Sequence, residues 1–476
     1  MTFAAEHDVV ILGAGPAGTS AAIRLAEMGL DVGVVERCRF PRGHVGICIA
    51  DETVALVEYL GLGGEFDDAR FWRRNLTAVR WGDAETRLVP RQGYHVDRAV
   101  FDQLMVGRSR LAGATVYQPV EAIEVKRLEY TGWGITISSD ERRQLLKARF
   151  IVDAAGRHPA VRGTRIKDGP PLVSVHAVWA LRRTADFDGL IEAGEDAWLW
   201  YAQTARDRAV VSVFCDPRRL RTGKKDGMQA KYSGLLRQFR SLDLEQLGRQ
   251  CSDPQACDAA GHHAETPVGD HYIRLGDACL SVDPLSSQGV HLALQSGLQG
   301  AVVVNTILRK SENTAAAQQF FRTRTAERIS RYTGRTKQEY ARVSAVCSNA
   351  FWRERAGEAS EAAADPPPPP SELSPRDRSD QLALSPHLTL DKAPAIDGAF
   401  VELRDVLRHP NIYGPIAYVE GVDLVRLVGA LPEKFAYCDI PKIWRGHIPP
   451  AVGDRIAAWL WHRRILVPAT GQPSGE

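Results

Sequence analysis

Three glycines and one acidic residue near the N-terminus have the spacing of a nucleotide-binding turn. The run Gly13-Ala14-Gly15-Pro16-Ala17-Gly18 follows a β-branched segment, 8–12, and precedes a helix-like stretch, 19–28. A second strand-like segment, 31–35, ends at Glu36. In such a turn the first glycine permits a tight bend and the second lets backbone N–H groups approach a pyrophosphate. The third allows the helix to pack closely on the strand.

Two charged features of this segment indicate that it binds a dinucleotide. The N-terminus of the helix directs its partial positive charge toward the phosphates. Glu36 lies about twenty residues further on, where a carboxylate accepts hydrogen bonds from a ribose diol and disfavours a 2′-phosphate. The order strand, glycine turn, helix, strand and acid therefore predicts a Rossmann-type unit. This pattern alone does not distinguish NAD from FAD.

Two later segments separate these cofactors. The first reads FIVDAAGR at 150–157 and continues through Val161-Arg162, and the second reads YIRLGDA at 272–278, followed by DPLSSQGVH at 283–291. They resemble the mid-chain strand-to-loop element and the second FAD fingerprint of the flavoprotein monooxygenase superfamily. That superfamily includes aromatic hydroxylases, flavin-dependent halogenases and geranylgeranyl-reductase-like enzymes. The resemblance covers about residues 7–350 and implies FAD as the cofactor.

The resemblance also implies which residues hold the flavin. Asp277 is expected at the ribityl chain, and Arg98 near the adenosine and pyrophosphate. The helix beginning near Gln288 would direct its positive end toward the pyrimidine side of the ring, where a reduced flavin carries negative charge. The full set of expected FAD contacts is Gly13, Gly15, Ala17, Gly18, Glu36, Arg37, Arg98, Asp153, Gly156, Gly276, Asp277, Pro284, Ser287, Gln288 and Gly289.

Four segments with strand periodicity lie between the flavin elements, at 86–94, 172–182, 197–203 and 209–215. We expect them to form an antiparallel sheet over the flavin ring, with the substrate between sheet and ring. Trp198 and Trp200 are two residues apart, so on a strand they point to the same face. They are either an aromatic wall for a planar substrate or two buried core rings.

The tryptophan pair resembles the WxWxIP element of flavin halogenases, with three departures. Ala202-Gln203 stands where halogenases have Ile-Pro, and Gln288 replaces a small hydroxyl residue. The segment 71–75 reads FWRRN and lacks the lysine expected of a halogenase there. Arginine is a poor substitute because it does not readily lose its proton. Oxygen insertion is therefore the preferred chemistry, and halogenation, or reduction or dehydrogenation on the same fold, is the alternative.

The loop after the second strand contains two further candidates, His44 and Cys48. In the resembled superfamily this loop runs close to the ring, so His44 is a candidate acid/base or flavin contact, or a residue that satisfies local backbone groups. Cys48 is a candidate reactive thiol or a packing residue. The eight cysteines contain no CxxC pair or other ligand spacing, and we expect no metal site.

The predicted fold class is α/β, with three parts. A Rossmann-type FAD-binding domain, 1–355, is discontinuous at about 1–75, 97–170 and 270–355, and an antiparallel substrate domain is inserted at about 76–96 and 171–269. A proline-rich linker, 356–388, contains EASEAAADPPPPP. A small, mainly helical or winged-helix-like module, 389–476, follows, with helices expected at 400–407, 419–431 and 452–461 and a short strand at 464–467. A docking role or a dimer contact fits this module best.

The predicted activity is FAD-dependent hydroxylation of an aromatic, indole-like substrate. With these departures from the halogenases and with its added module, the chain resembles flavoproteins that hydroxylate a protein-bound tryptophan in quinone cofactor biogenesis. The substrate is then an aromatic small molecule or a tryptophan-containing protein. Molecular oxygen is required, with NAD(P)H or a partner flavin reductase as electron donor. With 60 basic and 58 acidic residues we expect no nucleic-acid partner, and without a leader or apolar span we expect a cytoplasmic protein.

Overall fold

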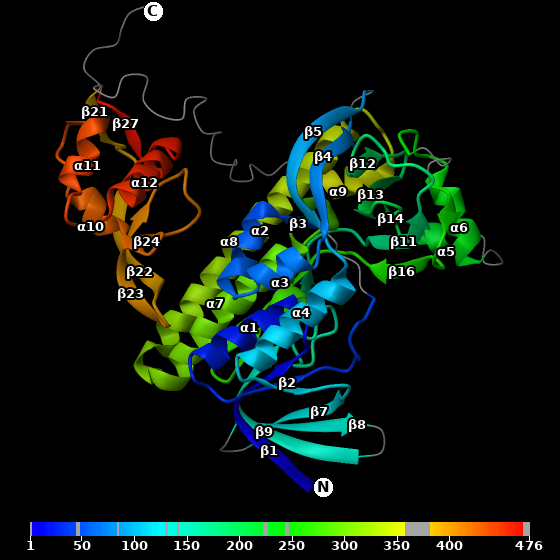
Figure 1. The fold of residues 1–476 in the computed structure, drawn as a ribbon, viewed down its shortest axis with the longest axis horizontal. Helices are drawn as coiled ribbons and strands as arrows, with labels where there is room; N and C mark the ends of the chain where they lie inside the picture. The colour runs from blue at the N-terminus through cyan, green and yellow to red at the C-terminus, as the bar shows by residue number, and fades with distance from the viewer. Residues whose placement is uncertain are drawn as a thin grey trace, which may run out of the picture. The chain divides into compact units, whose positions relative to one another are not determined.

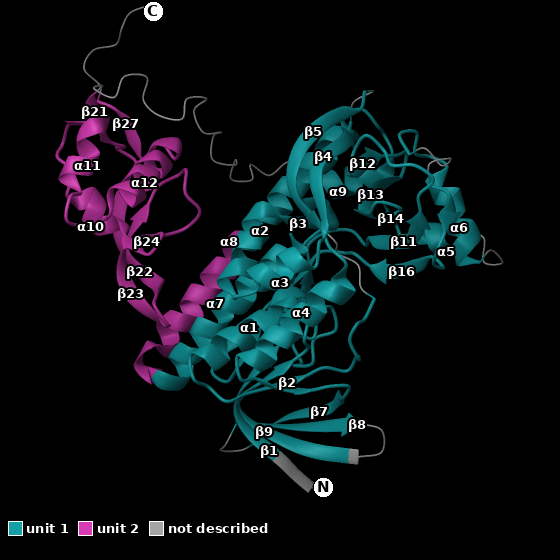
Figure 2. Cartoon of the chain, in the orientation of Figure 1, with its two compact units in different colours: residues 1–309, 328–362 teal, residues 310–327, 363–476 magenta. Residues whose placement is uncertain are grey.

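The structure is a computed structural model. It describes residues 2–43, 48–82, 85–128, 132–139, 142–221, 227–242, 247–357 and 381–469. The chain divides into two compact units (Figure 2), one formed by residues 1–309 and 328–362 and the other by residues 310–327 and 363–476. His44 and most of the proline-rich linker lie outside the described residues.

The first unit contains the predicted Rossmann-type sheet. Its parallel core has the strand order β6-β2-β1-β9-β19, and β8 and then β7 continue from β9 in antiparallel pairing. The strands are β1 (Thr2–Leu12), β2 (Val32–Val35), β6 (Thr115–Tyr117), β7 (Glu121–Leu128), β8 (Gly132–Ser139), β9 (Arg142–Asp153) and β19 (Tyr272–Arg274). The predicted strand at 8–12 is the end of β1.

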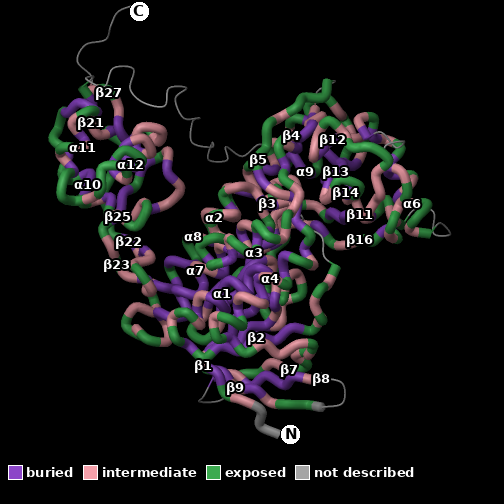
Figure 3. Tube along the Cα trace, in the orientation of Figure 1, coloured by how far each residue is buried: buried purple, intermediate pink, exposed green. Residues whose placement is uncertain are grey.

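Three helices lie side by side next to this sheet, α1 (Pro16–Glu27), α4 (Arg98–Leu111) and α7 (Gly289–Arg309) (Figure 1). Helices α1 and α7 pack closely because Gly297 has no side chain. A Cβ atom there would lie only 2.5 Å from the carbonyl oxygen of Ala17. Buried residues concentrate in these helices and in the parallel strands (Figure 3). The C-terminal ends of β1 and β9 therefore meet the N-termini of α1 and α7 at a rigid core.

The second sheet of this unit is the predicted substrate sheet, in the order β15-β11-β14-β13-β12-β4-β5-β3 with β16 beside β11. All four predicted strands are present and, apart from β4 and β12, neighbouring strands are antiparallel. The strands are β3 (Cys48–Ala50), β4 (Trp72–Arg80), β5 (Arg87–His95), β11 (Val173–Ala180), β12 (Gly189–Ala193), β13 (Ala197–Ala205), β14 (Arg208–Cys215), β15 (Arg249–Gln250) and β16 (Gln255–Asp258).

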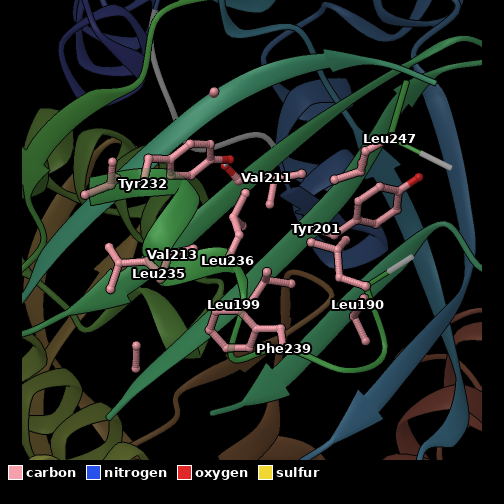
Figure 4. Packing of buried hydrophobic residues seen from close by; sticks show 14 of the residues in the cluster. Leu190, Leu199, Tyr201, Val211, Val213, Tyr232, Leu235, Leu236, Phe239 and Leu247 are labelled. Carbon is pink, nitrogen blue, oxygen red and sulfur yellow. Dashed lines mark hydrogen bonds between the residues drawn. The ribbon is translucent and has the colours of Figure 1, made fainter. Parts of the chain in front are cut away.

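The two faces of this sheet differ because successive side chains on a strand point to opposite sides. On β13, Leu199 and Tyr201 belong to an apolar cluster with Tyr232 and Leu236 of α6 (Met228–Leu236) (Figure 4). The alternate residues Trp198 and Trp200 belong to a different cluster. The helix-covered face is thus a conventional core, and the tryptophan face is available to form a site.

The remaining elements of this unit are shorter, apart from one long helix. Helix α8 (Thr314–Ser344) is followed by α9 (Ala350–Ala356), and the residues of α8 belong partly to each unit. Helix α2 begins at its two acidic residues, as its sequence indicates. The short elements are α2 (Asp51–Tyr59), α3 (Gly63–Asp68), β10 (Arg165–Lys167), α5 (Arg218–Arg221), β17 (His262–Ala264), β18 (Val268–Gly269) and β20 (Leu280–Ser281).

The second unit mixes strands and helices around its own core of buried residues, which includes Trp444, Ile456 and Leu460. Its elements are β21 (Gln381–Leu384), β22 (Thr389–Asp397), β23 (Phe400–Arg408), β24 (Tyr418–Val419), β25 (Val422–Asp423), α10 (Leu424–Gly429), β26 (Phe435–Ala436), α11 (Ile440–Ile443), α12 (Pro450–His462) and β27 (Leu466–Pro468). The predicted helices near 419–431 and 452–461 and the terminal strand are present, with shifted ends.

The predicted helix at 400–407 is wrong, since these residues form strand β23. They pair in continuous antiparallel register with β22, from Asp397 opposite Phe400 to Thr389 opposite Arg408. The two-residue connection begins with Gly398 at a positive φ of 57°, and an Asp-Gly pair between apolar segments is a strong hairpin signal.

None of the described helices is long and apolar enough to cross a bilayer.

The helix-covered core predicts the effect of a cavity. Leu199 is 0% exposed in the cluster shown in Figure 4, so Leu199→Ala should lower the free energy of unfolding by about 2–5 kcal/mol. Leu88 on β5 is 54% exposed, and Leu88→Ala should change it by less than about 0.5 kcal/mol. Urea unfolding followed by circular dichroism measures both, and equal effects would contradict this assignment of the core.

Candidate active site

The three glycines of the N-terminal turn have the geometry predicted from their spacing. Gly13 has a φ of 101°, and a Cβ atom there would lie 2.4 Å from the carbonyl oxygen of Ala154. A Cβ atom at Gly18 would lie 2.0 Å from the carbonyl oxygen of Gly13. At Gly15 the nearest atom would be a guanidinium nitrogen of Arg42 at 3.6 Å. The first and third glycines are therefore required by packing, whereas the second leaves open space.

That open space fits a pyrophosphate. Gly15 is the N-cap of α1 and, as a glycine, has no side chain to cap the first turn. Uncapped N–H groups at a helix N-terminus favour an anion, as does the helix dipole. Ala17 is buried on the same helix. A Cβ atom at Gly276 would lie 2.8 Å from the Cβ atom of Ala17. The two sequence fingerprints thus meet at this helix.

Glu36 lies at the end of β2 in a buried position. Its carboxylate accepts hydrogen bonds from the N–H groups of Ala14, at 2.9 Å, and Cys38, at 2.8 Å. The carboxylate is therefore held beside the glycine turn, and the ribose role stays a prediction. Arg37, which was also expected at the cofactor, is exposed.

A chain of charges links this carboxylate to α4. The Arg42 guanidinium lies 3.1 Å from Glu36 and 3.3 Å from Asp102, and Asp102 pairs with Arg98 at 2.8 Å. Arg98 is the first residue of α4 and is buried. The sequence analysis missed Arg42, and its only signal was a position six residues after Glu36 in the loop expected near the cofactor.

The mid-chain element is organised by Asp153. Its carboxylate accepts hydrogen bonds from the N–H groups of Ala155, at 3.2 Å, and Val161, at 2.8 Å, and burial raises its pKa. Asp153 therefore shapes the loop that carries Gly156, which has a φ of 76° with open space around it. Asp277 is partly exposed, and its carboxylate lies 3.7 Å from the Arg157 guanidinium on this loop.

The loop before α7 is fixed by Asp283. One carboxylate oxygen accepts a hydrogen bond from the N–H of Leu285 and the other accepts one from the Tyr340 hydroxyl, both at 2.9 Å. Burial raises the pKa of Asp283. Pro284 opens the short helical turn after it, and Ser287 has a φ of 53°. Gln288 and Gly289 follow at the start of α7.

The two tryptophans on β13 have different environments. Trp198 is buried, stacks on Phe214 with ring centres 3.8 Å apart, and donates a hydrogen bond to the Tyr340 hydroxyl at 3.1 Å. It is a core ring. Trp200 is partly exposed, meets the His95 ring edge-on with ring centres 5.8 Å apart, and shares its apolar cluster with Leu285. The aromatic-wall prediction therefore rests on Trp200.

Cys48, Arg74 and His95 form a polar cluster beside Trp200, from strands β3, β4 and β5. The Arg74 guanidinium donates to the Cys48 sulfur at 2.9 Å, and burial raises the pKa of that thiol. A raised pKa disfavours the thiolate and therefore a reactive cysteine. Burial, aided by the charge of Arg74, lowers the pKa of His95 to about 4. The sequence analysis missed His95, although it lies three residues before Arg98.

A small cavity borders Tyr340. It has a volume of about 50 Å³ and its lining includes Asp283, Lys337, Tyr340 and Arg355. Among the residues that the structure describes, no group of three or more His, Cys, Asp or Glu side chains is placed to hold a metal ion.

Comparisons with known proteins agree with this geometry. The family described as FAD dependent oxidoreductase matches residues 8–157. Tryptophan 2-halogenase of Chondromyces crocatus is 25% identical over 67% of this chain and 65% of its own length. A 1H-pyrrole-2-carbonyl-[peptidyl-carrier protein] chlorinase of Pseudomonas fluorescens is 22% identical over 61% of this chain and 74% of its own. This chain thus spans less than two thirds of the first relative.

Two solved structures match most of the chain. The flavin-dependent halogenase CmlS superposes with a TM-score of 0.76 over 98% of this chain and 96% of its own, at 21% identity, which shows the shared fold. The peptidyl tryptophan dihydroxylase QhpG superposes with a TM-score of 0.69 over 96% and 99%, at 26% identity. The chain is therefore similar to FAD-dependent oxidoreductases, and among them to flavoproteins named as halogenases and as a peptidyl tryptophan dihydroxylase.

The open space at Gly15 predicts a variant that loses only the cofactor. Valine tolerates the φ of −76° found at Gly15, so Gly15→Val should leave the fold intact while filling the pyrophosphate space. We expect FAD affinity to fall by at least about tenfold, measured by flavin fluorescence titration. The exposed Gly64, with no atom near its missing Cβ, supplies the control Gly64→Val. Unchanged affinity in Gly15→Val would exclude this pyrophosphate site.

His95 predicts a specific pH dependence of stability. Because its pKa is lower in the folded protein than the ordinary 6.5, the unfolded chain binds the proton more readily, and stability is lost as pH falls from about 6.5 to about 4. His95→Asn, which does not titrate, should lose about 2–3 kcal/mol less than the wild type between about pH 7 and about pH 4.5. Parallel unfolding free energies across this range would contradict the buried neutral imidazole.

Proposed function

We propose that this protein is an FAD-dependent monooxygenase that hydroxylates an indole-like aromatic ring, including the ring of a peptide-bound tryptophan. The observation that carries the proposal is how the arginines of segment 71–75 are bound, since this segment lacks the lysine of a halogenase. Arg74 is 7% exposed and its guanidinium donates to the Cys48 sulfur and to the Gln92 carbonyl. A guanidinium held in this way keeps its proton and is no substitute for a reactive amine.

Arg73, the other cation of this segment, also has a structural role. Its guanidinium lies 5.4 Å from the centre of the Tyr94 ring and donates to the Tyr94 hydroxyl at 3.0 Å. Lysine is absent from β4, from its neighbours β5 and β12, and from β13 on the far side of β12. These strands therefore offer no lysine amine to a substrate, which suits oxygen transfer from the flavin.

Bound FAD would supply the activation of molecular oxygen, with electrons from NAD(P)H or a partner flavin reductase. The chain's own residues would hold and shield the reactants. The uncapped N-terminus of α1 would bind the pyrophosphate, and the N-terminus of α7 would stabilise negative charge on the reduced ring. The apolar surfaces of Leu285 and Trp200 would exclude water from the space between loop and sheet.

The likeness to QhpG supports a peptide-bound substrate, because that structure is named a peptidyl tryptophan dihydroxylase essential for tryptophylquinone cofactor biogenesis and it matches this chain over nearly its full length. The second unit is the proposed docking part. Its β22–β23 hairpin exposes two large apolar side chains, Leu390 at 62% and Leu403 at 59%, and such side chains favour contact with another protein.

Halogenation is the second candidate, and one feature of the site favours it. Lys337 of α8 lines the same cavity as Asp283 and Tyr340, so a lysine is present beside the α7 loop even though the segment 71–75 has none. Two relatives also carry names of enzymes that halogenate a tryptophan or a carrier-bound pyrrole. The two candidates predict different products and different effects of losing Lys337.

Product mass distinguishes the two functions. The FAD-loaded protein should be supplied with a chemical reductant, labelled molecular oxygen and bromide, and incubated with indole or a tryptophan-containing peptide. Hydroxylation predicts a product that carries labelled oxygen and no halogen, with turnover retained in Lys337→Met. A bromine isotope pattern that disappears in Lys337→Met would instead establish the halogenase. The exposed Lys126 supplies the control Lys126→Met, which should change neither outcome.

A further inference from the structure

Two buried polar atoms lie next to Trp200 without a hydrogen-bond partner. They are Nε2 of His95, whose residue is 0% exposed, and Oγ1 of Thr77, whose residue is 2% exposed. Buried polar atoms in folded proteins are nearly always hydrogen-bonded, so two such atoms near one ring require an explanation. A ligand group that pairs with them is one such explanation.

The hydrogen bonds of His95 define what its free nitrogen does. Nδ1 lies 2.8 Å from the backbone carbonyl oxygen of Gln203. A carbonyl oxygen only accepts hydrogen bonds, so Nδ1 carries the proton, and with a pKa lowered to about 4 the ring is neutral near pH 7. Nε2 therefore presents a lone pair. It accepts a hydrogen bond and has no proton to donate.

A glycine brings Thr77 and Trp200 close to strand β12. A Cβ atom at Gly189 would lie 3.3 Å from both Thr77 Oγ1 and the outer edge of the Trp200 indole, which is tighter than an ordinary contact. Strand β12 carries Gly189 between β4, which carries Thr77, and β13, which carries Trp200. The Thr77 hydroxyl and the Trp200 indole edge therefore lie close together at this glycine.

The polar cluster of Cys48, Arg74 and His95 is linked through Trp200 to the loop before α7. Trp200 packs in the same cluster as Leu285, which directly follows the Asp283-Pro284 pair before α7. Strand β3, which pairs Cys48 with His95, also packs against α7. An aromatic molecule that stacks near Trp200 would therefore present one edge to His95 and another part of its ring to the flavin side.

We propose that His95 Nε2 accepts a hydrogen bond from the ring N–H of the aromatic substrate and so selects substrates with a donor on the ring. This proposal rests on the proposed function, since it names a contact of the same site. Other charged groups near His95 do not compete for the substrate, because Arg74 is bound to Cys48 and Gln92, and Asp188 accepts from Trp72 and from two backbone N–H groups. The contact orients the ring, and the same hydrogen bond increases electron density on the carbons that react.

A pair of isosteric probes tests the contact without turnover. Indole has the ring N–H, and benzothiophene has nearly the same shape without a donor. Binding of each to the FAD-loaded protein is measured from the change in flavin absorbance, and the ratio of the two dissociation constants is compared between variants. The ratio cancels effects on general stability or on flavin loading.

Two substitutions separate the two nitrogens of His95. Asparagine places its amide near the position of Nδ1 and retains a donor for Gln203, but it has no acceptor at the position of Nε2, whereas glutamine places an acceptor there. We expect the preference for indole to fall about tenfold in His95→Asn and to be largely retained in His95→Gln. The exposed His447 of the second unit supplies the control His447→Asn, with the wild-type ratio.

Three outcomes would overturn the proposal: an unchanged ratio in His95→Asn, an equal loss in His95→Gln, or no binding of either probe to the wild-type protein. These outcomes are distinct from failure of the proposed function. A protein that binds indole through His95 but yields no oxygenated product retains this contact and loses the monooxygenase assignment. A protein that hydroxylates indole but keeps the wild-type ratio in His95→Asn retains the monooxygenase assignment and loses the His95 contact.

Discussion

A hydrogen-bonded chain through Tyr340 holds the first unit's site together. The Tyr340 hydroxyl accepts from the buried Trp198 indole and donates to the Asp283 carboxylate. It thereby joins strand β13, helix α8 and the loop before α7. Because each of these groups has a partner, the chain avoids the cost of an unsatisfied buried group. The distance between the flavin loop and the tryptophan face of the sheet is set by this chain.

The cofactor region obeys a second constraint, which is close backbone approach. A side chain at Gly13, Gly18 or Gly297 would overlap backbone atoms of its neighbours, so α1, α7 and β9 come together only because these positions are glycine. Ion pairs then link the end of β2 to α4, since the Arg42 guanidinium lies between Glu36 and Asp102. Packing creates the open end of α1, and electrostatics position the carboxylate beside it.

The two faces of the sheet that contains β13 differ in how completely their polar atoms are paired. Its helix-covered face buries apolar side chains against α6 and the buried Tyr232 hydroxyl there donates to the Val211 carbonyl. The opposite face carries Trp200, His95 and Thr77, with polar atoms that the folded chain leaves without partners. A protein tolerates such atoms on one face when the other face supplies the stabilising burial. This division allows the second face to serve a ligand.

The sequence by itself determined the features that depend on near neighbours. The glycine turn, the strand ending at Glu36, the helix beginning at Gly289 and the shared face of Trp198 and Trp200 all follow from local conformation and from strand or helix periodicity. Tertiary structure alone decided that Trp198 is a core ring, that Arg42 bridges Glu36 and Asp102, and that Phe400 lies on a strand. It also brought His95 to Trp200, more than a hundred residues away in the sequence. These contacts depend on strand register and on long-range packing, which local residue patterns do not specify.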